Sequence, residues 1–130
     1  MQFNDNMPIY LQIADRICEN ILSGKWGSDC RIPSVREMGA EYQVNPNTMM
    51  RSYDYLQQKN IIYNKRGIGY FVSPGSISLI LEDQRKKLID NDLPQMIKKM
   101  LLLGFSREDA IEAVRKEFDS IQQEKQNENQ

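Results

Sequence analysis

Three short segments that follow one another along the chain constrain its fold more than any other feature of the sequence. They are Arg31–Met38, Val44–Thr48 and Lys65–Gly69. In the first, Ser34 and Glu37 have the S-x-x-E spacing of a capping box; in the second, Asn45-Pro46 combines a favoured N-cap residue with a proline in the first helical turn. Two short helices with a tight turn between them, followed by a glycine-rich hairpin, form the order of a winged helix-turn-helix, in which the second helix enters the major groove of duplex DNA.

Hydrophobic periodicity supplies the other elements of this domain, which we predict to span residues 7–75. Isoleucine recurs at every fourth position from Ile9 to Ile21, which is the period of a helix with one apolar side. Residues 61–65 and 70–73 have the composition of two short strands, and the turn between them holds the glycines. The sequence therefore predicts a mainly α fold with a small β-hairpin.

The helix that begins at Pro46 has two chemically different sides. Met49, Tyr53 and Leu56 fall at offsets of four and seven, which is the spacing of a buried stripe. Core packing gives no reason for an arginine on the opposite side. The residues on that outward side are Asn47, Met50, Arg51 and Asp54.

We expect three parts of this domain to contact DNA. The first turns of a helix in the major groove lie closest to the base edges, where asparagine suits adenine, arginine suits guanine or a phosphate, and methionine can touch the thymine methyl group. The start of the preceding helix suits a phosphate, and a cation at the glycine tip of the hairpin fits the narrow minor groove. The predicted DNA-binding residues are Ser34, Arg36, Asn45, Pro46, Asn47, Thr48, Met50, Arg51, Lys65, Arg66, Gly67 and Gly69.

Each of these signals also has an ordinary structural interpretation. A capping box marks a helix start wherever it occurs, an Arg-Gly-x-Gly hairpin is usually only a tight turn, and Arg36 or Arg51 could be solvated surface cations. The combination in this order is much less common than its parts. The net charge of −1 gives DNA binding little support, although residues 31–70 hold six Lys and Arg against three Asp and Glu, a local surplus of +3.

Residues 76–123 continue as helices with a broad apolar stripe. Pro94 lacks a backbone donor, so we expect a kink or a break near Asn91-Asp92; Leu103-Gly104 ends that helix and Ser106 caps the last one. The stripe is wider than a pair of helices needs for packing on itself, so we expect a second copy of the chain to cover it. The alternative is that both helices pack back onto the winged domain. The predicted dimerisation residues are Ile77, Ile80, Leu81, Leu88, Leu93, Ile97, Met100 and Leu101.

Composition disfavours several kinds of site and location. The chain has no histidine, and Cys18 and Cys30 lie in unrelated contexts, so we expect no metal site, no disulfide and no cofactor. The N-terminus lacks a signal-peptide pattern, and no apolar run approaches the roughly 20 residues that span a bilayer, so we expect no membrane association and a cytoplasmic, nucleoid-associated protein. The polar residues 124–130 have no apolar anchor and are expected to be disordered.

Two other functions are weaker alternatives. Leu102–Ser106 and the alanine-containing helix after it slightly resemble ubiquitin-associated helical bundles, which would make the chain a protein-interaction module. An enzyme is disfavoured because the sequence has no histidine, no G-x-S-x-G motif, no phosphate loop with a lysine and no carboxylate pair at an informative spacing.

Residues 7–75 resemble the winged helix-turn-helix domain of the GntR family of bacterial transcription regulators. The matching segments are Pro8–Ile13, Ile32–Met38, Val44–Thr48, Tyr53, Leu56 and Gly67–Val72. The Asn-Pro-Asn-Thr form and the short helical region after the domain are most similar to the YtrA subfamily. The resemblance implies a sequence-specific regulator that works as a homodimer on a palindromic operator, often repressing operons for ABC transporters. It leaves the existence and identity of a small-molecule effector open.

The same resemblance implies which residues contact DNA: Arg36, the start of the helix at Pro46, and the wing glycines. Pro46 and Met50 stand where many members of the family carry arginine. Recognition is therefore expected to depend on Asn45, Asn47 and Arg51.

Overall fold

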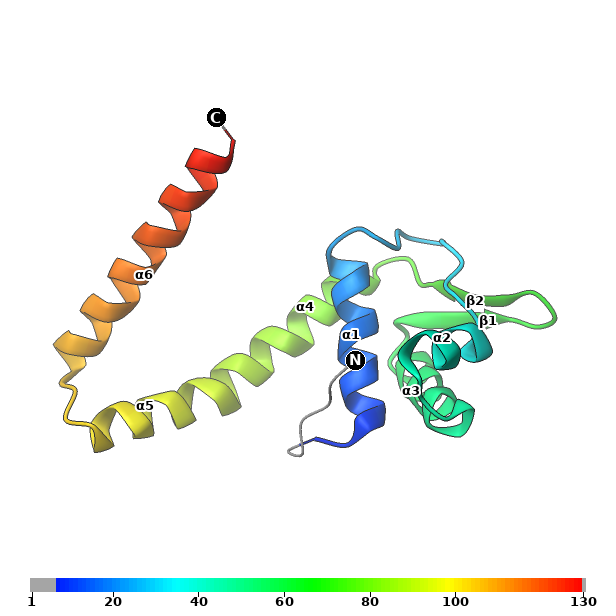
Figure 1. Ribbon diagram of the computed structural model, residues 1–130, viewed down its shortest axis with the longest axis horizontal. Coiled ribbons are helices and arrows are strands. Elements are labelled where there is room, and N and C mark those ends of the chain that lie inside the picture. Colours follow the sequence, from blue (N-terminus) through cyan, green and yellow to red (C-terminus); the bar gives the residue numbers. More distant parts are fainter. Residues whose placement is uncertain (1–6, 130) are drawn as a thin grey trace. The chain divides into compact units, whose positions relative to one another are not determined.

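The computed structural model of the protein describes residues 7–129, and the chain divides into two compact units, Met1–Gln84 and Arg85–Gln130. The predicted fold class is confirmed, because the chain is mostly helical with a small antiparallel hairpin (Figure 1). In chain order the elements are α1 (Ile9–Leu22), α2 (Val35–Tyr42), α3 (Pro46–Gln58), β1 (Ile62–Lys65), β2 (Gly69–Val72), α4 (Ser76–Lys87), the π-helical segment η1 (Leu88–Asp92), α5 (Leu93–Leu102) and α6 (Arg107–Glu128).

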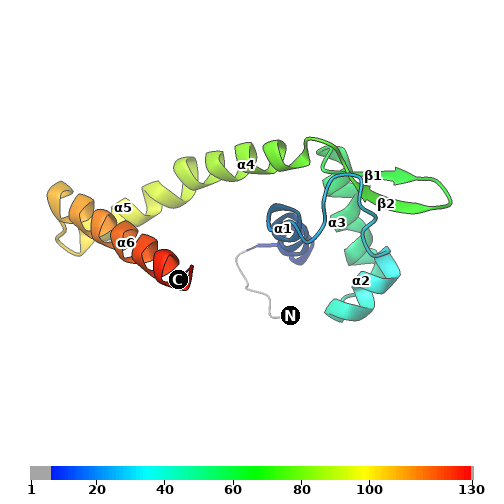
Figure 2. The ribbon, with the colours of Figure 1, turned by 90° about the horizontal axis from the view of Figure 1, so that it is seen from above.

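The first unit is assembled around α3, which packs against α1, α2 and β1 (Figure 2). One side of α1 is buried, as the isoleucine spacing predicted, since Ile13, Ile17 and Ile21 all lie in the core. The helix ends at Ser23-Gly24, where Gly24 adopts φ +85°, a conformation that costs glycine little.

Both predicted helix starts are present, which fixes the two helices that matter most for function. The Ser34 hydroxyl accepts a hydrogen bond from the Glu37 N–H at 3.1 Å, and the Glu37 carboxylate accepts one from the Ser34 N–H at 3.3 Å. At α3, the Asn45 side-chain oxygen accepts from the N–H of Asn47 at 2.8 Å. Gln43, in a left-handed conformation with φ 56°, turns the chain between the two helices.

Tyr53 ties α3 to the segment that precedes α2. Its side chain is fully buried, and its hydroxyl donates to the Pro33 carbonyl oxygen at 2.5 Å. Its ring also meets that of Tyr70 in β2 edge to face, with the centroids 4.9 Å apart. Burial raises the pKa of the Tyr53 phenol well above its ordinary value, so the hydroxyl stays protonated and keeps its role as a donor.

The hairpin is joined by a third extended segment that the sequence did not reveal. β1 and β2 pair antiparallel with Ile62 opposite Val72 and Lys65 opposite Gly69. Residues 30–32 then run beside β2, where the Ile32 N–H donates to the Tyr70 carbonyl at 3.0 Å. Sequence patterns missed this segment because it forms a single isolated bridge and its partner lies far along the chain.

The start of α4 belongs to the first unit, which corrects one predicted dimerisation residue. Ile80 is only 1% exposed and is part of the same core as Tyr53, so it has no surface left for a partner. Apolar spacing alone does not reveal this, because a helix that leaves a domain turns one side of its first turns to that domain. The division between the units falls after Gln84 rather than before Ser76.

The interruption expected before Pro94 takes the form of a π-helical turn. The segment η1 covers Leu88–Asp92, and α5 begins directly after it with Pro94 in its first turn. A proline removes one backbone donor and crowds the carbonyl four residues earlier, and a wider turn accommodates both effects. The helix is therefore distorted near Asn91-Asp92 rather than broken there.

In the second unit, α5 ends at Leu102 and Gly104 adopts φ +87°, as the sequence predicted. The Ser106 hydroxyl then accepts from the Asp109 N–H at 3.1 Å in a second capping box that starts α6. The expectation of a disordered tail was wrong for most of its length, because α6 continues to Glu128. Residues 122–128 are mainly Gln, Glu and Lys without Gly or Pro, and this high helix propensity extends the helix without an apolar anchor. Among the described helices, none has the length and apolar character that a membrane span requires.

We predict that Tyr53→Phe lowers the free energy of unfolding by about 1–3 kcal/mol, because the buried Pro33 carbonyl loses its donor. Urea denaturation of the full chain measures the change. Tyr55→Phe is the matched control, since Tyr55 lies on the same helix but is only half-buried. Equal stability of Tyr53→Phe and the control would show that the Pro33 bond contributes nothing.

Candidate nucleic-acid interface

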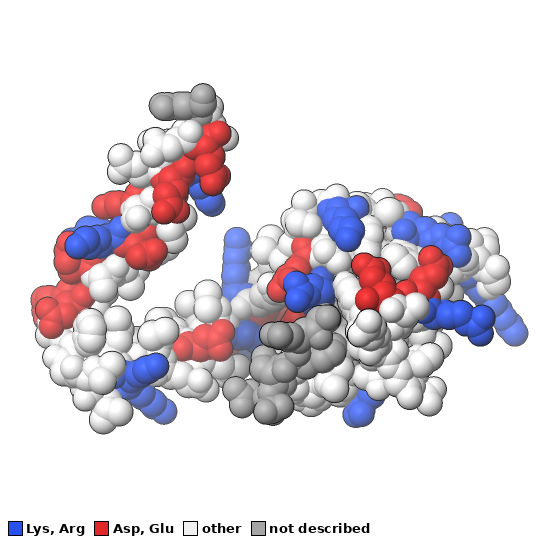
Figure 3. Space-filling model, in the orientation of Figure 1, with Lys and Arg blue, Asp and Glu red and all other residues white. Residues whose placement is uncertain are grey.

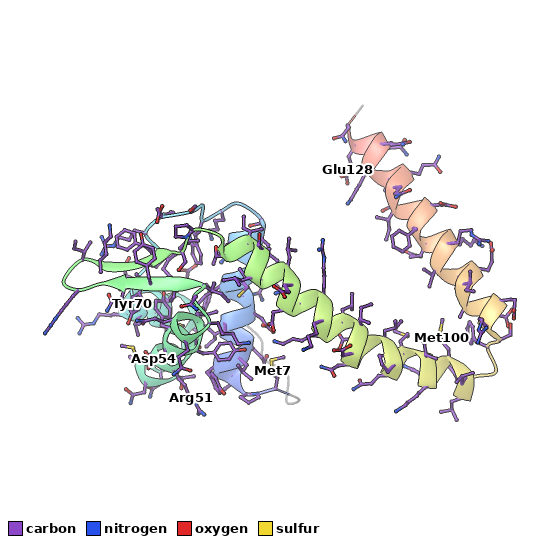
Figure 4. All side chains as sticks on the ribbon, turned by 180° about the vertical axis from the view of Figure 1, so that it is seen from behind. Met7, Arg51, Asp54, Tyr70, Met100 and Glu128 are labelled. Atoms are coloured by element: carbon purple, nitrogen blue, oxygen red, sulfur yellow. The ribbon has the colours of Figure 1, made fainter. Side chains whose placement is uncertain are left out.

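The two sides of α3 differ as completely as the sequence predicted. Met49, Tyr53 and Leu56 have no exposed surface. The opposite side is open to solvent over Asn47, Met50, Arg51 and Asp54. Arg51 and Asp54 extend from α3, and Tyr70 on the hairpin lies nearer to Asp54 than to Arg51 (Figure 4). An outward side of this kind, on a helix of this width, can fit the major groove of DNA.

The N-terminal turn of α3 leaves its asparagines unequally placed for recognition. The side-chain oxygen of Asn45 is occupied by the cap, so its amide nitrogen is the group left to donate outward. Asn47 is exposed and stands one turn from Arg51 on the same side. Thr48 is half-buried and therefore presents less surface than its neighbours.

Arg51 is held in place by an aromatic ring on another helix. Its guanidinium carbon lies 4.1 Å from the ring centroid of Tyr10 in α1. The backbone of Tyr10 is itself fixed to α3, because the Ser52 hydroxyl donates to the Tyr10 carbonyl at 2.7 Å. The ring of Tyr55 meets Tyr10 edge to face at 6.1 Å. Tyr10 therefore orients Arg51 without neutralising its charge.

A second tyrosine flanks the other edge of the outward side. The hydroxyl of Tyr70 lies 3.8 Å from the sulfur of Met50, which places the two residues in contact across the junction of hairpin and α3. Burial and, secondarily, the Asp54 carboxylate raise the pKa of the Tyr70 phenol, so it remains a neutral donor near the interface. Neither Tyr10 nor Tyr70 was predicted as a site residue, because each acts through a residue distant in sequence.

The start of α2 is less free than the sequence suggested. The hydroxyl and N–H of Ser34 are both engaged by Glu37, so a phosphate approaching there meets a carboxylate already in place. Arg36 is exposed in the first turn of α2. Of the predicted residues on this helix, Arg36 is the one whose charge is available to a ligand.

The hairpin presents its cations at one end. Gly67 and Gly69 adopt φ +80° and φ +146°, conformations that allow the tight turn around exposed Arg66. The ammonium of Lys65 lies 4.9 Å from the ring centroid of Phe71. Lys and Arg side chains gather toward this end of the first unit in the view of Figure 3. The hairpin thus carries positive charge beside the outward side of α3.

Comparison with known proteins points in one direction. Residues 9–72 match the family described as bacterial regulatory proteins, gntR family. Over 114 residues the chain is 34% identical to the uncharacterised HTH-type transcriptional regulator YhcF of Bacillus subtilis (strain 168), covering 88% of this chain and 93% of that protein. It is 33% identical over 90 residues to the HTH-type transcriptional repressor YtrA of the same strain, covering 69% and 68%.

A solved structure agrees with the sequence matches. The crystal structure of a regulator assigned to the GntR family, from Bacteroides thetaiotaomicron, gives a TM-score of 0.70 at 46% identity. The match covers 88% of this chain and 98% of that one. The likeness therefore includes both units and is not limited to the winged domain.

We predict that Tyr10→Leu weakens binding to duplex DNA roughly two- to five-fold, the equivalent of about 0.5–1 kcal/mol for an exposed cation over a ring. Fluorescence anisotropy measures the affinity, and circular dichroism checks that the fold is kept. Tyr10→Phe keeps the ring beside the Arg51 guanidinium and should retain the affinity. An equal loss in Tyr10→Phe and Tyr10→Leu would contradict a positioning role for the Tyr10 ring.

Proposed function

Because the chain belongs to the gntR family of bacterial regulatory proteins, we propose that it acts as a homodimeric repressor that binds a palindromic operator. Family membership makes the chain a DNA-binding transcription regulator and not an enzyme. Its similarity to the repressor YtrA supports the repressor part of the proposal. The exposed side of α3 supports operator binding, and the apolar surface of the second unit supports the homodimer.

The observation that carries the DNA-binding mode is the exposed side of α3. In the proposed complex, α3 lies in the major groove, where Asn47 faces adenine, Arg51 faces guanine or a phosphate, and Met50 touches a thymine methyl group. The hairpin lies alongside, with Arg66 directed at the minor groove. Pro46, at the start of α3, has no side-chain donor that could reach a base. Arg51 is the cation in α3, so base recognition by a charged donor of this helix depends on it.

The apolar surface of the second unit supports the homodimer. α5 and α6 flank a groove of ≈ 620 Å³ whose lining is almost entirely apolar. Its residues include Met96, Ile97, Met100, Phe105, Ile111 and Val114. Leu101, which also lines the groove, and Leu102 next to it are 65% and 85% exposed, which is unusual for leucine in a water-facing helix. A second copy burying these surfaces would remove the unfavourable contact with water.

Charge complementarity supports the same partner. Residues 85–102 carry five Lys and Arg against two Asp, whereas α6 carries seven Asp and Glu against four Lys and Arg. Acidic side chains follow α6 along its length in Figure 3. Packing α6 of one copy against α5 of the other would bring the opposite surpluses together while both apolar sides are covered. A two-fold dimer would present two α3 helices to half-sites one DNA turn apart, roughly 34 Å.

We predict that Arg51→Ala and Arg66→Ala each abolish specific binding to the native promoter while leaving the dimer intact. Gel-shift and anisotropy assays on the native promoter measure this, and the Arg66 variant should also lose about one charge from the salt dependence if it meets a phosphate. Arg16→Ala is the control, because Arg16 is an exposed arginine on α1 paired with Glu19. Unchanged affinity in both test variants would refute the binding mode.

We predict that Val114→Glu converts the dimer into a monomer, because it buries a carboxylate in an apolar contact. Sedimentation velocity measures the molecular mass. Operator affinity should also fall, since each winged domain then binds its half-site without a linked second domain. Gln123→Glu places the same side chain on the opposite side of α6 and should change neither quantity. A Val114→Glu protein that remains dimeric would rule out the groove as the interface.

The proposal extends to the regulated genes through the resemblance to YtrA-type regulators, whose targets include ABC transporter operons. Sequencing the genomic fragments that the protein retrieves, and locating them beside transporter genes or elsewhere, decides this point. Loss of reporter expression when the protein is present distinguishes a repressor from an activator.

A further inference from the structure

Arg31 is a cation beside the hairpin that the DNA-binding mode above does not use. Its segment runs antiparallel to β2, with the Val72 N–H donating to the Cys30 carbonyl at 2.9 Å and the Ile32 N–H donating to the Tyr70 carbonyl at 3.0 Å. Arg31 is the residue bridged to Phe71. Directly opposed residues in such a pair project from the same side of the sheet, so Arg31 and Phe71 share one side.

The Arg31 guanidinium lies in a space that a missing side chain leaves open. A Cβ placed on Gly69 would lie 2.9 Å from Nε of Arg31, so that the arginine would have to move, and 3.6 Å from Cζ. The guanidinium therefore lies against the Gly69 backbone, in the space that a side chain at this position would fill. Because Gly69 is paired with Lys65, this is the side of the hairpin from which Lys65 projects.

Lys65, the second cation on this side, stands over an aromatic ring. Lys65 holds its ammonium 4.9 Å from the Phe71 centroid, and the Phe71 ring stacks on Tyr63 at 5.6 Å with an interplanar angle of 21°. The nearby Asp29 carboxylate accepts a hydrogen bond from the Tyr63 hydroxyl at 2.8 Å. Within residues 7–129, no ion pair of 4.0 Å or less involves either Arg31 or Lys65. The Asp29 carboxylate is engaged by the Tyr63 hydroxyl, so both cations can still meet a bound anion.

We propose that Arg31 and Lys65 form a phosphate clamp on this side of the wing, which grips the DNA backbone bordering the minor groove while Arg66 faces the groove itself. This inference rests on the proposed DNA-binding function and adds a contact that carries no base information. Contacts to phosphate strengthen binding to all sequences alike, and each one releases counterions from the duplex. The clamp thus contributes affinity and register, whereas α3 contributes sequence preference.

The test compares the full-length protein with its Arg31→Gln variant on two duplexes, the fragment retrieved from the genome and an unrelated sequence. The dissociation constant is measured by anisotropy across a series of KCl concentrations. Arg31→Gln should weaken binding to both duplexes by the same factor, and the slope of log K against log salt should shrink by about 0.9. Arg31→Lys should keep most of the slope, and the double variant Arg31→Gln with Lys65→Gln should lose about twice as much.

Lys25→Gln is the matched control, because Lys25 is also a cation of the first unit that stands over an aromatic ring, that of Trp26 at 5.6 Å. It should leave the affinity and the slope unchanged. An Arg31→Gln protein that binds the retrieved duplex with the original slope overturns the clamp and leaves the proposed function standing. A wild-type protein that retrieves no duplex at all overturns both.

Discussion

The buried hydroxyl of Tyr53 is the contact through which the recognition surface is assembled. From one position on α3, this side chain donates to the Pro33 carbonyl before α2 and meets the ring of Tyr70 in the wing. The start of α2, the outward side of α3 and the hairpin are therefore positioned by a single residue. Because that residue has no exposed surface, the three parts of the proposed interface are connected through the core.

Aromatic rings solve an electrostatic problem for a chain with a net charge of only −1. A carboxylate would orient a cation but would also cancel the charge that a phosphate needs to meet. Tyr10 and Phe71 orient Arg51 and Lys65 while leaving their charges intact. Lys59 shows the contrast, since it lies over Tyr55 but also pairs with Asp83 at 3.6 Å, and it is not part of the proposed interface. For DNA binding, the position of each cation therefore matters more than the net charge of the chain.

Local signals in the sequence were sufficient for the helices and the hairpin. Helix caps depend only on residues a few positions apart, so their effects could be predicted without the fold. The caps are Ser34 with Glu37, Asn45 before Pro46, and Gly104. The segment beside β2 and the ring under Arg51 could not, because each depends on residues that only the folded chain brings together. The burial of Ile80 was missed for the same reason. The tail differs from its prediction for the opposite reason, since the local helix propensity of Gln, Glu and Lys extends α6 to Glu128 without an apolar anchor.

The contact between the Arg31 guanidinium and the bare backbone of Gly69 has a consequence for how such chains can change over time. Two independent conditions favour glycine at position 69: its φ of +146°, which side chains rarely adopt, and the Arg31 guanidinium in the space of a Cβ. A substitution at position 69 would therefore strain the backbone and also displace the Arg31 side chain. A glycine that sequence inspection would assign to the turn alone thus also makes room for a cation from a segment distant in sequence.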